Sequence, residues 1–336
     1  MKRISVVTPC FEEEANVAEL YLRIRQVFEA LPGYEYEHIF IDNASRDGTV
    51  ARVKAIAARD RRVKLIVNAR NFGHVRSPVY GMLQASGDAV ILMASDLQDP
   101  PELIASFLER WEAGYRVVLG VKKETAESFP MRAVRRWYYD LLGRLSEVEL
   151  TKQATGFGLY DRAVLDVLAE IDDPYPYLRG LVSDIGFEAA HVEFSKPARK
   201  RGRSKNSLYT LYDLAMLGIT SHSKIPLRVA TLLGFALSGV SLLVAVGYLV
   251  AKLLLWNDFQ LGLAPLVVGL FFFSSVQLLF VGVIGEYVGA IHTQVLKRPL
   301  VVERERVNFD RGGARLGARP PEPRLAERDS ERADAP

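Results

Sequence analysis

Short apolar runs alternate with longer amphipathic stretches along the first part of the chain. Four runs rich in β-branched residues have the character of strands buried in a parallel sheet: Ile4–Thr8, His38–Asp42, Val63–Asn68 and Ala89–Met93. Between them, apolar residues recur at helical spacing, which predicts helices over Glu13–Leu31, Asp47–Arg59 and Val75–Ala85. This alternation predicts an α/β fold in which helices cover both faces of a parallel sheet.

Polar segments follow the four predicted strands at their carboxyl ends. They are Thr8–Glu14, Asp42–Thr49, Asn68–His74 and Ala94–Pro101. Ligands of open parallel sheets bind outside the edge where the carboxyl ends of the strands meet. The pattern therefore indicates a candidate site at this edge.

The pattern farther along is helical from Arg132 to Glu170, apart from an interruption at Gly156–Tyr160. The two glycines around Phe157 indicate that the backbone turns there or that another group approaches it closely. By themselves they point to no particular chemistry.

Two later stretches are apolar on all sides. Val229–Ala251 has 23 residues without a charge, and Phe259–Gly285 has 27. Each exceeds the roughly 20 residues that cross the hydrocarbon core of a bilayer. A buried core helix is the alternative, but such helices rarely run this long without a charge. We therefore predict two transmembrane helices within residues 225–291.

The charges around these spans predict their orientation. The run Lys196–Lys205 carries six cations and no acid, and Lys297 and Arg298 follow the second span, whereas the connection Lys252–Gly262 has one Lys and one Asp. The positive-inside rule then places both termini in the cytoplasm and the connection outside, in a multi-pass protein of the inner membrane.

Two further segments flank the spans. Residues 207–224 are predicted to form a juxtamembrane segment, in which the amphipathic stretch Leu208–Ile219 suits a helix lying in the interface. Residues 292–336 are predicted to be a cytoplasmic tail, disordered beyond about residue 308 because large apolar residues are scarce there.

Composition removes several classes of function. The one cysteine, Cys10, excludes an internal disulfide and a cysteine-based metal cluster. The five histidines lack the spacing of a helical zinc site, and the short N-terminal run does not suit a secretory signal. The formal net charge is only +3, and we expect no nucleic-acid partner.

Asp96 is the strongest candidate for metal chemistry, because it follows the predicted strand Ala89–Met93 directly. Magnesium is typically held by one or two protein carboxylates together with substrate phosphates, so a single aspartate can suffice. Asp99 suits the alternative role of capping the helix that Pro100 and Pro101 begin.

Two other segments have a functional and a structural interpretation. Asp42 can accept hydrogen bonds from a base or ribose, although Ser45, Asp47 and Gly48 equally favour a turn with a helix cap. The segment Arg201–Lys205 (RGRSK) suits bidentate phosphate binding, and anionic membrane lipids are the competing ligand for such a juxtamembrane run.

The order of these motifs resembles that of the family 2 glycosyltransferases that make polyprenyl-phosphate sugars, the dolichol-phosphate mannose synthase type, and above all their bacterial branch with two C-terminal transmembrane helices. The likeness covers about residues 3–300. Its motifs are Pro9–Val17 (PCFEEEANV), Phe40–Thr49 (FIDNASRDGT), Asn71–His74 (NFGH), Gly87–Asp88, Asp96–Glu102 (DLQDPPE), Arg179–Leu181 (RGL) and Arg203–Lys205 (RSK). Each motif is modest alone, but the series with the paired spans is specific.

The resemblance implies a GT-A (Rossmann-like) catalytic domain over residues 1–206, with Mg²⁺ or Mn²⁺ as cofactor. It implies inverting transfer of a sugar from a UDP- or GDP-linked donor to polyprenyl (undecaprenyl) phosphate, for a cell-envelope glycan or lipid. The implied nucleotide contacts are Pro9, Glu13, Asp42, Asn71 and Lys122; the implied metal–diphosphate contacts are Asp96 and Gln98; and the implied acceptor-phosphate contacts are Arg203 and Lys205.

The chain departs from the family pattern at two places. Ala94 stands where the family commonly has the first aspartate of D-A-D, and Gly156–Phe157–Gly158 replaces a G-D-F motif whose acid is often proposed as base. A phosphate monoester has its second pKa near ~6, so the acceptor is largely dianionic at pH 7 without a base. If a base is needed, Asp161 and Asp184 are the nearest candidates.

Two other functions stay open. A non-catalytic membrane protein that binds a nucleotide-sugar is compatible with Ala94 and Gly156. A processive polysaccharide synthase is disfavoured, because its Q-x-x-R-W motif is incomplete at Arg136–Trp137 and two spans are few for a channel. The donor sugar and its base are not readable, and the paired spans leave room for a homo-oligomer.

Overall fold

The computed structural model describes residues 1–123, 154–195, 216–220, 223–254 and 263–309. Within these residues, one mixed sheet has eight strands in the order β7-β5-β6-β4-β1-β2-β3-β8. Its centre is parallel, as the apolar runs predicted, with β1 (Lys2–Cys10), β2 (Tyr34–Asp42), β3 (Val63–Asn68) and β4 (Ala89–Leu92).

Helices cover both faces of this sheet, which confirms the predicted layers. The helices α1 (Val17–Glu29), α2 (Thr49–Ala57) and α4 (Ile104–Glu112) pack on one face, and α3 (Gly73–Leu83), α6 (Arg162–Glu170) and α7 (Leu178–Ile185) pack on the other. Successive residues of β1 serve opposite faces, since Val6 joins the first apolar cluster and Val7 the second.

The segment expected as an interruption of a helical pattern is a strand. β6 (Ala154–Asp161) runs antiparallel between β4 and β5 (Val117–Lys122), and β7 (Ala189–Phe194) lies parallel to β5 at the edge. Gly158 permits the close approach, because a Cβ there would lie 2.4 Å from the carbonyl oxygen of Val118. A short 3-10 turn, η1 (Pro101–Leu103), precedes α4.

A strand after the second long helix returns to the α/β domain. β8 (Glu303–Val307) pairs antiparallel with β3 at the sheet edge, and Asn308 Nδ2 donates to the carbonyls of Ala57 and Val63, both at 2.8 Å. The polar sequence of residues 303–307 predicted a tail here, and the structure shows a strand. The sheet therefore includes residues beyond 1–206.

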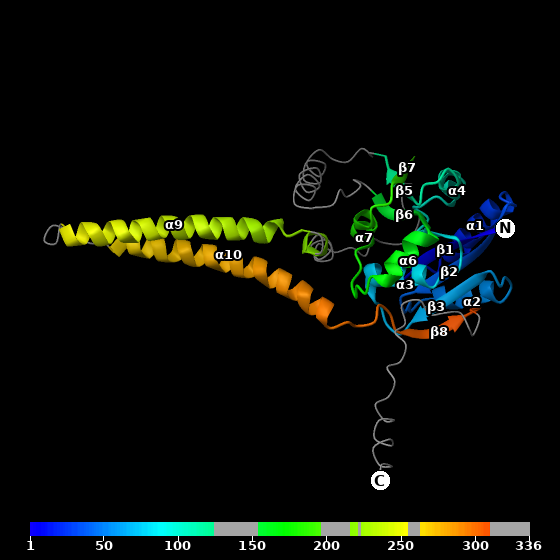
Figure 1. The fold of residues 1–336 in the computed structure, drawn as a ribbon. Coiled ribbons are helices and arrows are strands. Elements are labelled where there is room, and N and C mark those ends of the chain that lie inside the picture. The colour runs from blue at the N-terminus through cyan, green and yellow to red at the C-terminus, as the bar shows by residue number, and fades with distance from the viewer. Residues whose placement is uncertain (124–153, 196–215, 221–222, 255–262, 310–336) are drawn as a thin grey trace, which may run out of the picture.

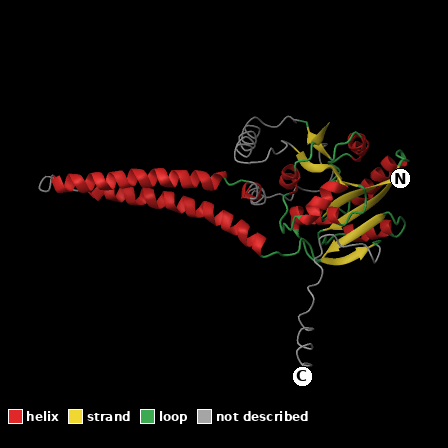
Figure 2. Ribbon diagram, viewed as in Figure 1, coloured by secondary structure: helices red, strands yellow, loops and turns green. Residues whose placement is uncertain are grey.

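Two long helices, α9 (Ile225–Leu254) and α10 (Leu263–Val295), project together from the domain (Figures 1 and 2). Ile225–Leu254 and Leu266–Val295 are each 30 residues of high mean hydropathy, with none of the most apolar window buried. A helix of this length spans about 45 Å, more than the hydrocarbon core of about 30 Å. By length and composition, both helices suit membrane spans, as predicted.

The base of the second helix meets the domain that carries the candidate site. Gln294 Nε2 donates to Asp173 Oδ1 at 2.8 Å, and Lys297 Nζ lies 3.6 Å from Asp172 Oδ2. The chain begins on the side of the domain farthest from α9 and α10, so β1 runs toward the helices (Figure 1). The carboxyl edge of the sheet consequently faces the projecting pair.

The predicted interfacial helix Leu208–Ile219 lies almost wholly outside the described residues. Its last part falls in the described residues 216–220, which are helical. The basic run Lys196–Lys205 is not described either.

Candidate active site

The loops after β1 and β2 form one hydrogen-bonded unit at the carboxyl edge. The backbone N–H of Glu12 donates to Ser45 Oγ at 2.8 Å, and that of Glu13 donates to Thr49 Oγ1 at 2.9 Å. In return, the Glu14 carboxylate accepts from the N–H of Gly48 at 3.0 Å, at the start of α2. Each loop thus holds the other in position.

Asp42 closes the turn at the end of β2. Its carboxylate accepts from Ser45 N at 2.9 Å and from Ser45 Oγ at 2.5 Å, and the residue is wholly buried. Burial raises the pKa of Asp42, while the hydrogen bonds from Ser45 oppose the rise. The turn interpretation is confirmed, and the nucleotide contact of Asp42 stays a prediction.

Asn43 joins the ends of β2 and β3, a role that the sequence analysis missed. Its Oδ1 accepts from Asn68 Nδ2 at 2.8 Å and from Phe72 N at 3.3 Å, while its Nδ2 donates to the Gly73 carbonyl at 3.2 Å. Asn71 is exposed at the same edge and accepts from Gly73 N at 2.8 Å, where α3 begins. The sequence does place an asparagine at the end of each of these two strands, Asn43 and Asn68, and this pattern could have predicted the contact.

The loop after β4 holds Asp96 and Gln98, both half-buried, at the same edge. Asp96 Oδ1 accepts from Gln98 N at 3.1 Å. Asp99 is only 5% exposed, and its Oδ2 accepts from Ala94 N at 3.0 Å, which closes the loop. Asp99 therefore has a structural contact, whereas Asp96 lies where a metal–diphosphate ligand is expected.

Backbone strain occurs in the loops after β1, β2 and β4. Five described non-glycine residues have a positive φ, and three of them are Glu12, Ala44 and Leu97, at 56°, 61° and 59°. Such conformations cost free energy for residues with a Cβ, and they concentrate at ligand sites. The strain supports the choice of this edge as the site.

Asp161, a candidate base, lies away from the other predicted site residues. It pairs with Ala89 at the beginning of β4, so it lies at the opposite edge of the sheet from Asp96. Its carboxylate accepts from Trp111 Nε1 at 2.7 Å and from Ala163 N at 2.9 Å, where it caps α6. The antiparallel direction of β6 causes this placement, which the sequence pattern did not reveal.

The positions of the other predicted site residues follow from the strands that carry them, for those residues that the structure describes. Lys122 ends β5 and Pro9 lies near the end of β1, so both are at the carboxyl edge, and both are half-buried. Gly158 pairs with Leu92 at the end of β4, so the segment that lacks the family's acid is also at this edge. Arg203 and Lys205 lie outside the described residues.

Comparison with known proteins decides the family. Residues 5–168 match the family model described as Glycosyl transferase family 2. Over 300 residues the chain is 35% identical to the uncharacterized glycosyltransferase YkcC of Bacillus subtilis, covering 89% of this chain and 92% of that protein. This chain belongs to glycosyltransferase family 2. The expected family, the GT-A fold class and the expectation of an enzyme are thereby confirmed.

The chain is also similar to a prophage-derived protein and to a solved structure. The chain is 34% identical over 298 residues to the SfII prophage-derived bactoprenol glucosyl transferase of Shigella flexneri, covering 88% of this chain and 96% of that protein. Among solved structures, glucosyl-3-phosphoglycerate synthase from Mycobacterium tuberculosis in complex with UDP is 21% identical, covering 65% of this chain and 78% of that one, with a TM-score of 0.45.

The candidate site offers few side chains that could bind a divalent cation. No group of three or more His, Cys, Asp or Glu side chains suitable for a metal occurs in the described parts of the chain. Asp96 carries a half-buried carboxylate next to the backbone of Gln98, at the strand end where diphosphate binds in open sheets. One carboxylate plus substrate phosphates fits a magnesium or manganese ion.

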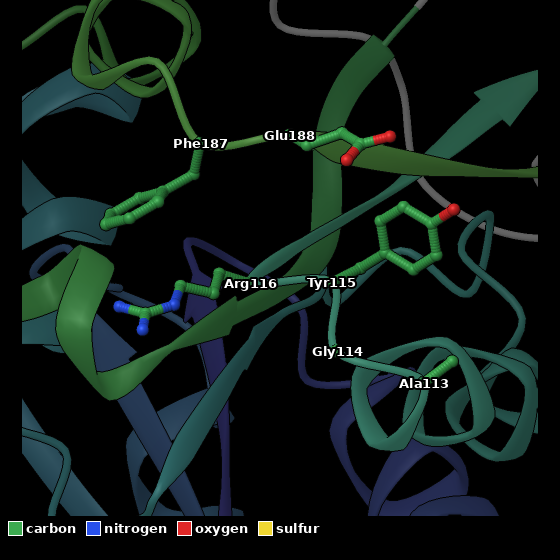
Figure 3. A pocket seen from close by; sticks show the side chains of 6 residues that line it. All are labelled: Ala113, Gly114, Tyr115, Arg116, Phe187 and Glu188. Atoms are coloured by element: carbon green, nitrogen blue, oxygen red, sulfur yellow. The ribbon is translucent and has the colours of Figure 1, made fainter.

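A cavity of about 400 Å³ lies away from this site (Figure 3). It is lined by Ala113, Gly114, Tyr115, Arg116, Phe187 and Glu188, which precede β5 and β7. These positions are at the amino edge of the parallel strands, opposite Asp96. The topology therefore separates this cavity from the catalytic edge of the glycosyltransferase.

Proposed function

We propose that this enzyme transfers a sugar from a nucleotide-sugar to a polyprenyl phosphate at the cytoplasmic face of the inner membrane. The observation that carries the proposal is the direction of the sheet, whose donor-site edge faces the apolar helices α9 and α10 (Figure 1). A relative matched over 88% of the chain is named a bactoprenol glucosyl transferase, which supports a lipid acceptor of this class.

The donor nucleotide would lie over the joined loops after β1, β2 and β3. Pro9, Glu13, Asp42 and Asn71 are the proposed nucleotide contacts. All four lie at the carboxyl edge, where open sheets bind nucleotides. Asp42 would act through the turn that it holds, because its own carboxylate is bonded to Ser45.

Asp96 and Gln98 would hold the diphosphate together with Mg²⁺ or Mn²⁺, and Lys122 would add a cation at the same edge. The metal ion supplies charge neutralisation on the leaving diphosphate. Preorganised charge of this kind stabilises the transition state more strongly in a site that excludes water. Arg203 and Lys205 remain the predicted contacts of the acceptor phosphate.

The acceptor would attack the anomeric carbon from the face opposite the nucleotide, so the transfer would invert. The residue at position 156 is a glycine, and Asp161 lies at the far edge, so neither supplies a base. A phosphate monoester with a second pKa near ~6 is already an anionic nucleophile at pH 7. The enzyme's task is then to position it and to neutralise charge.

The membrane orientation follows from the connections of the helix pair. α9 begins after residues of the domain, and the chain after α10 returns to the sheet as β8, so both outer ends of the pair lie on the domain's side. Cations flank these outer ends. The positive-inside rule supports a cytoplasmic domain with both termini in the cytoplasm.

The test is transfer of radiolabelled sugar from a panel of UDP- and GDP-sugars into organic-extractable lipid. The full-length enzyme is supplied with undecaprenyl phosphate and either magnesium or manganese. We expect labelled lipid from one donor, abolished by EDTA. No labelled lipid from any donor, in protein that still binds nucleotide, would favour the non-catalytic alternative.

A further inference from the structure

Three arginines gather where the end of α10 approaches the catalytic edge. Arg76 is the fourth residue of α3, Arg70 precedes that helix, and Arg298 follows α10 by three residues. Burial lowers the pKa of Arg76, and the positive charges of Arg70 and Arg298 lower it further, while Tyr175 and Asp173 oppose the shift. The guanidinium groups of Arg70 and Arg298 therefore both lie close enough to Arg76 to repel its charge.

Arg76 is half-buried, Arg70 and Arg298 are exposed, and none of the three makes an ion pair with a carboxylate among the described residues. Among the described residues, Arg76 and Arg298 make no ion pair and donate no side-chain hydrogen bond, and Arg76 Nε is buried without an acceptor. The Arg76 guanidinium lies 5.1 Å from the centre of the Tyr175 ring. Arg70 lies over Phe72 at 4.0 Å and donates only to the Asn71 carbonyl, within the described chain.

The two nearby aspartates are engaged elsewhere. Asp172 pairs with Lys297, and Asp173 accepts from Gln294 Nε2 and from Tyr175 N, both at 2.8 Å. These contacts dock the end of α10 on the domain and leave the positive charge of the arginines in excess. A buried donor without an acceptor costs free energy of about 1–3 kcal/mol, so a bound anion would offset a real penalty.

The position and chemistry of the cluster identify the anion. Guanidinium groups bind phosphate through paired N–H donors, more specifically than a point charge does. The apolar span ends at Val295, so Arg298 lies at the level of the lipid headgroups. The half-buried ring of Tyr175 suits the boundary between headgroups and hydrocarbon.

We propose that Arg70, Arg76 and Arg298 form a binding site for a phosphate group carried on a membrane lipid. The assignment of that lipid as the acceptor rests on the proposed function, because a polyprenyl phosphate presents this chemistry at the catalytic edge. A phospholipid headgroup presents the same chemistry. The site lies between α3, the segment before α7 and the end of α10.

The test measures calorimetric binding of farnesyl phosphate to the full-length enzyme in a neutral detergent, with farnesol as the uncharged probe. The variants are Arg76→Gln and Arg298→Gln; the second changes an exposed side chain and so keeps the test valid if the first perturbs folding. Arg61→Gln is the matched control, an exposed arginine before β3 at the opposite edge. We expect each cluster variant to bind farnesyl phosphate about tenfold more weakly, with UDP binding unchanged.

A second arm compares dioctanoyl phosphatidylglycerol with dioctanoyl phosphatidylcholine. Loss of farnesyl phosphate binding supports the acceptor, whereas loss of phosphatidylglycerol binding alone supports a site for headgroup phosphate. Cluster variants that bind every probe as Arg61→Gln does would overturn the proposal. Wild-type enzyme that binds farnesyl phosphate but transfers no sugar would refute the proposed function and leave the site standing.

Discussion

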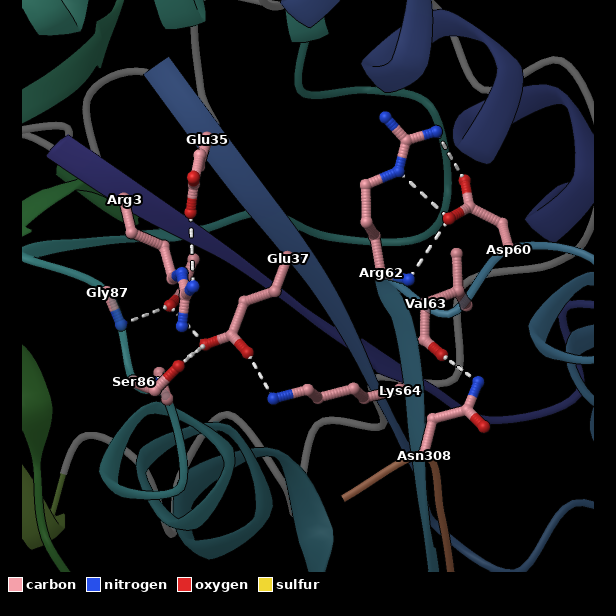
Figure 4. Close-up of polar contacts among 12 residues, drawn as sticks. Arg3, Glu35, Glu37, Asp60, Arg62, Val63, Lys64, Ser86, Gly87 and Asn308 are labelled. Atoms are coloured by element: carbon pink, nitrogen blue, oxygen red, sulfur yellow. Dashed lines mark hydrogen bonds and ion pairs between the residues drawn. The ribbon is translucent and has the colours of Figure 1, made fainter. Parts of the chain in front are cut away.

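Replacing Lys64 by methionine should destabilise the catalytic domain strongly, because it removes the counter-ion of a buried carboxylate. Lys64 Nζ lies 2.5 Å from Glu37 Oε2, and the two side chains are 18% and 5% exposed (Figure 4). Glu37 also accepts from Ser5 Oγ at 2.6 Å and from Ser86 N at 2.7 Å, which ties β1, β2 and the turn before β4 together.

The magnitude follows from the burial of the pair. Removing one partner of a buried ion pair costs about 3–5 kcal/mol. The partial exposure of Lys64 lets water screen the remaining charge, so we expect about 2–4 kcal/mol in the free energy of unfolding. For a domain of this size, that corresponds to a fall of roughly 4–16 °C in Tm. Lys54→Met is the control, because its partner Glu305 is 40% exposed and the loss should stay within about 1 kcal/mol.

The effect should depend on pH in a defined direction. Burial alone would raise the pKa of Glu37, but hydrogen bonds from Lys64, Ser5 and Ser86 outweigh it and hold the pKa below its usual value. The stability that this carboxylate contributes is therefore present at neutral pH and is lost as the pH falls through the lowered pKa. The difference in Tm between wild type and Lys64→Met should be largest at pH 7 and shrink below about pH 4, where a glutamate becomes protonated. Thermal unfolding of the two proteins, followed by circular dichroism at pH 7 and below about pH 4, measures this difference. An equal difference in Tm at the two pH values would refute the electrostatic reasoning.

Four further outcomes test the site and the sheet. Asp96→Asn should lower sugar transfer by at least about a hundredfold at unchanged Tm, whereas Asp166→Asn on the exposed side of α6 should transfer normally; equal rates would remove Asp96 from the metal site. Asp161→Ala should leave the rate intact and cost about 1–2 kcal/mol in unfolding free energy through the lost helix cap, and a loss of rate at unchanged Tm would restore it as base. Transfer by the wild-type enzyme should rise with pH through ~6 and then level off, as the acceptor phosphate loses its second proton, and a rise centred elsewhere would contradict attack by the unassisted dianion. Asn308→Ala should lose two hydrogen bonds and force a φ of 60° on alanine, so hydrogen exchange in β8 should accelerate more than in Asn308→Gly; equal acceleration would show that the backbone strain is immaterial.

The catalytic edge could be predicted because its residues follow strands that are readable locally. The four apolar runs have the right length and composition for buried strands, and all four are strands in the structure. Parallel strands have their carboxyl ends at the same edge of the sheet, whatever conformation the loops adopt. The strand pattern alone therefore placed Pro9, Asp42, Asn71 and Asp96 at one edge. What each side chain contacts could not be predicted, since the hydrogen bonds of Asp42 and Asp99 depend on loop conformations with positive φ.

Residues whose placement depends on the direction of a strand were harder to predict. Asp161 follows the glycine segment by a few positions, and a strand of that length carries it from one edge of the sheet to the other. The antiparallel direction of β6 comes from its pairing with β4 and β5, which are far away in the sequence. β8 carries alternating charges, Glu303 to Arg306, as edge strands often do, so its own pattern resembled a polar tail.

The sequence by itself determined the local features of this protein: the parallel strands, the two apolar helices and the family motifs along the chain. These depend on periodicity and run length, which neighbouring residues encode. Only the tertiary structure decided the direction of β6, the return of β8 to the sheet and the meeting of Arg70, Arg76 and Arg298 at the base of α10. Those features join segments up to more than two hundred residues apart, and their energies arise from contacts that exist only once the chain has folded.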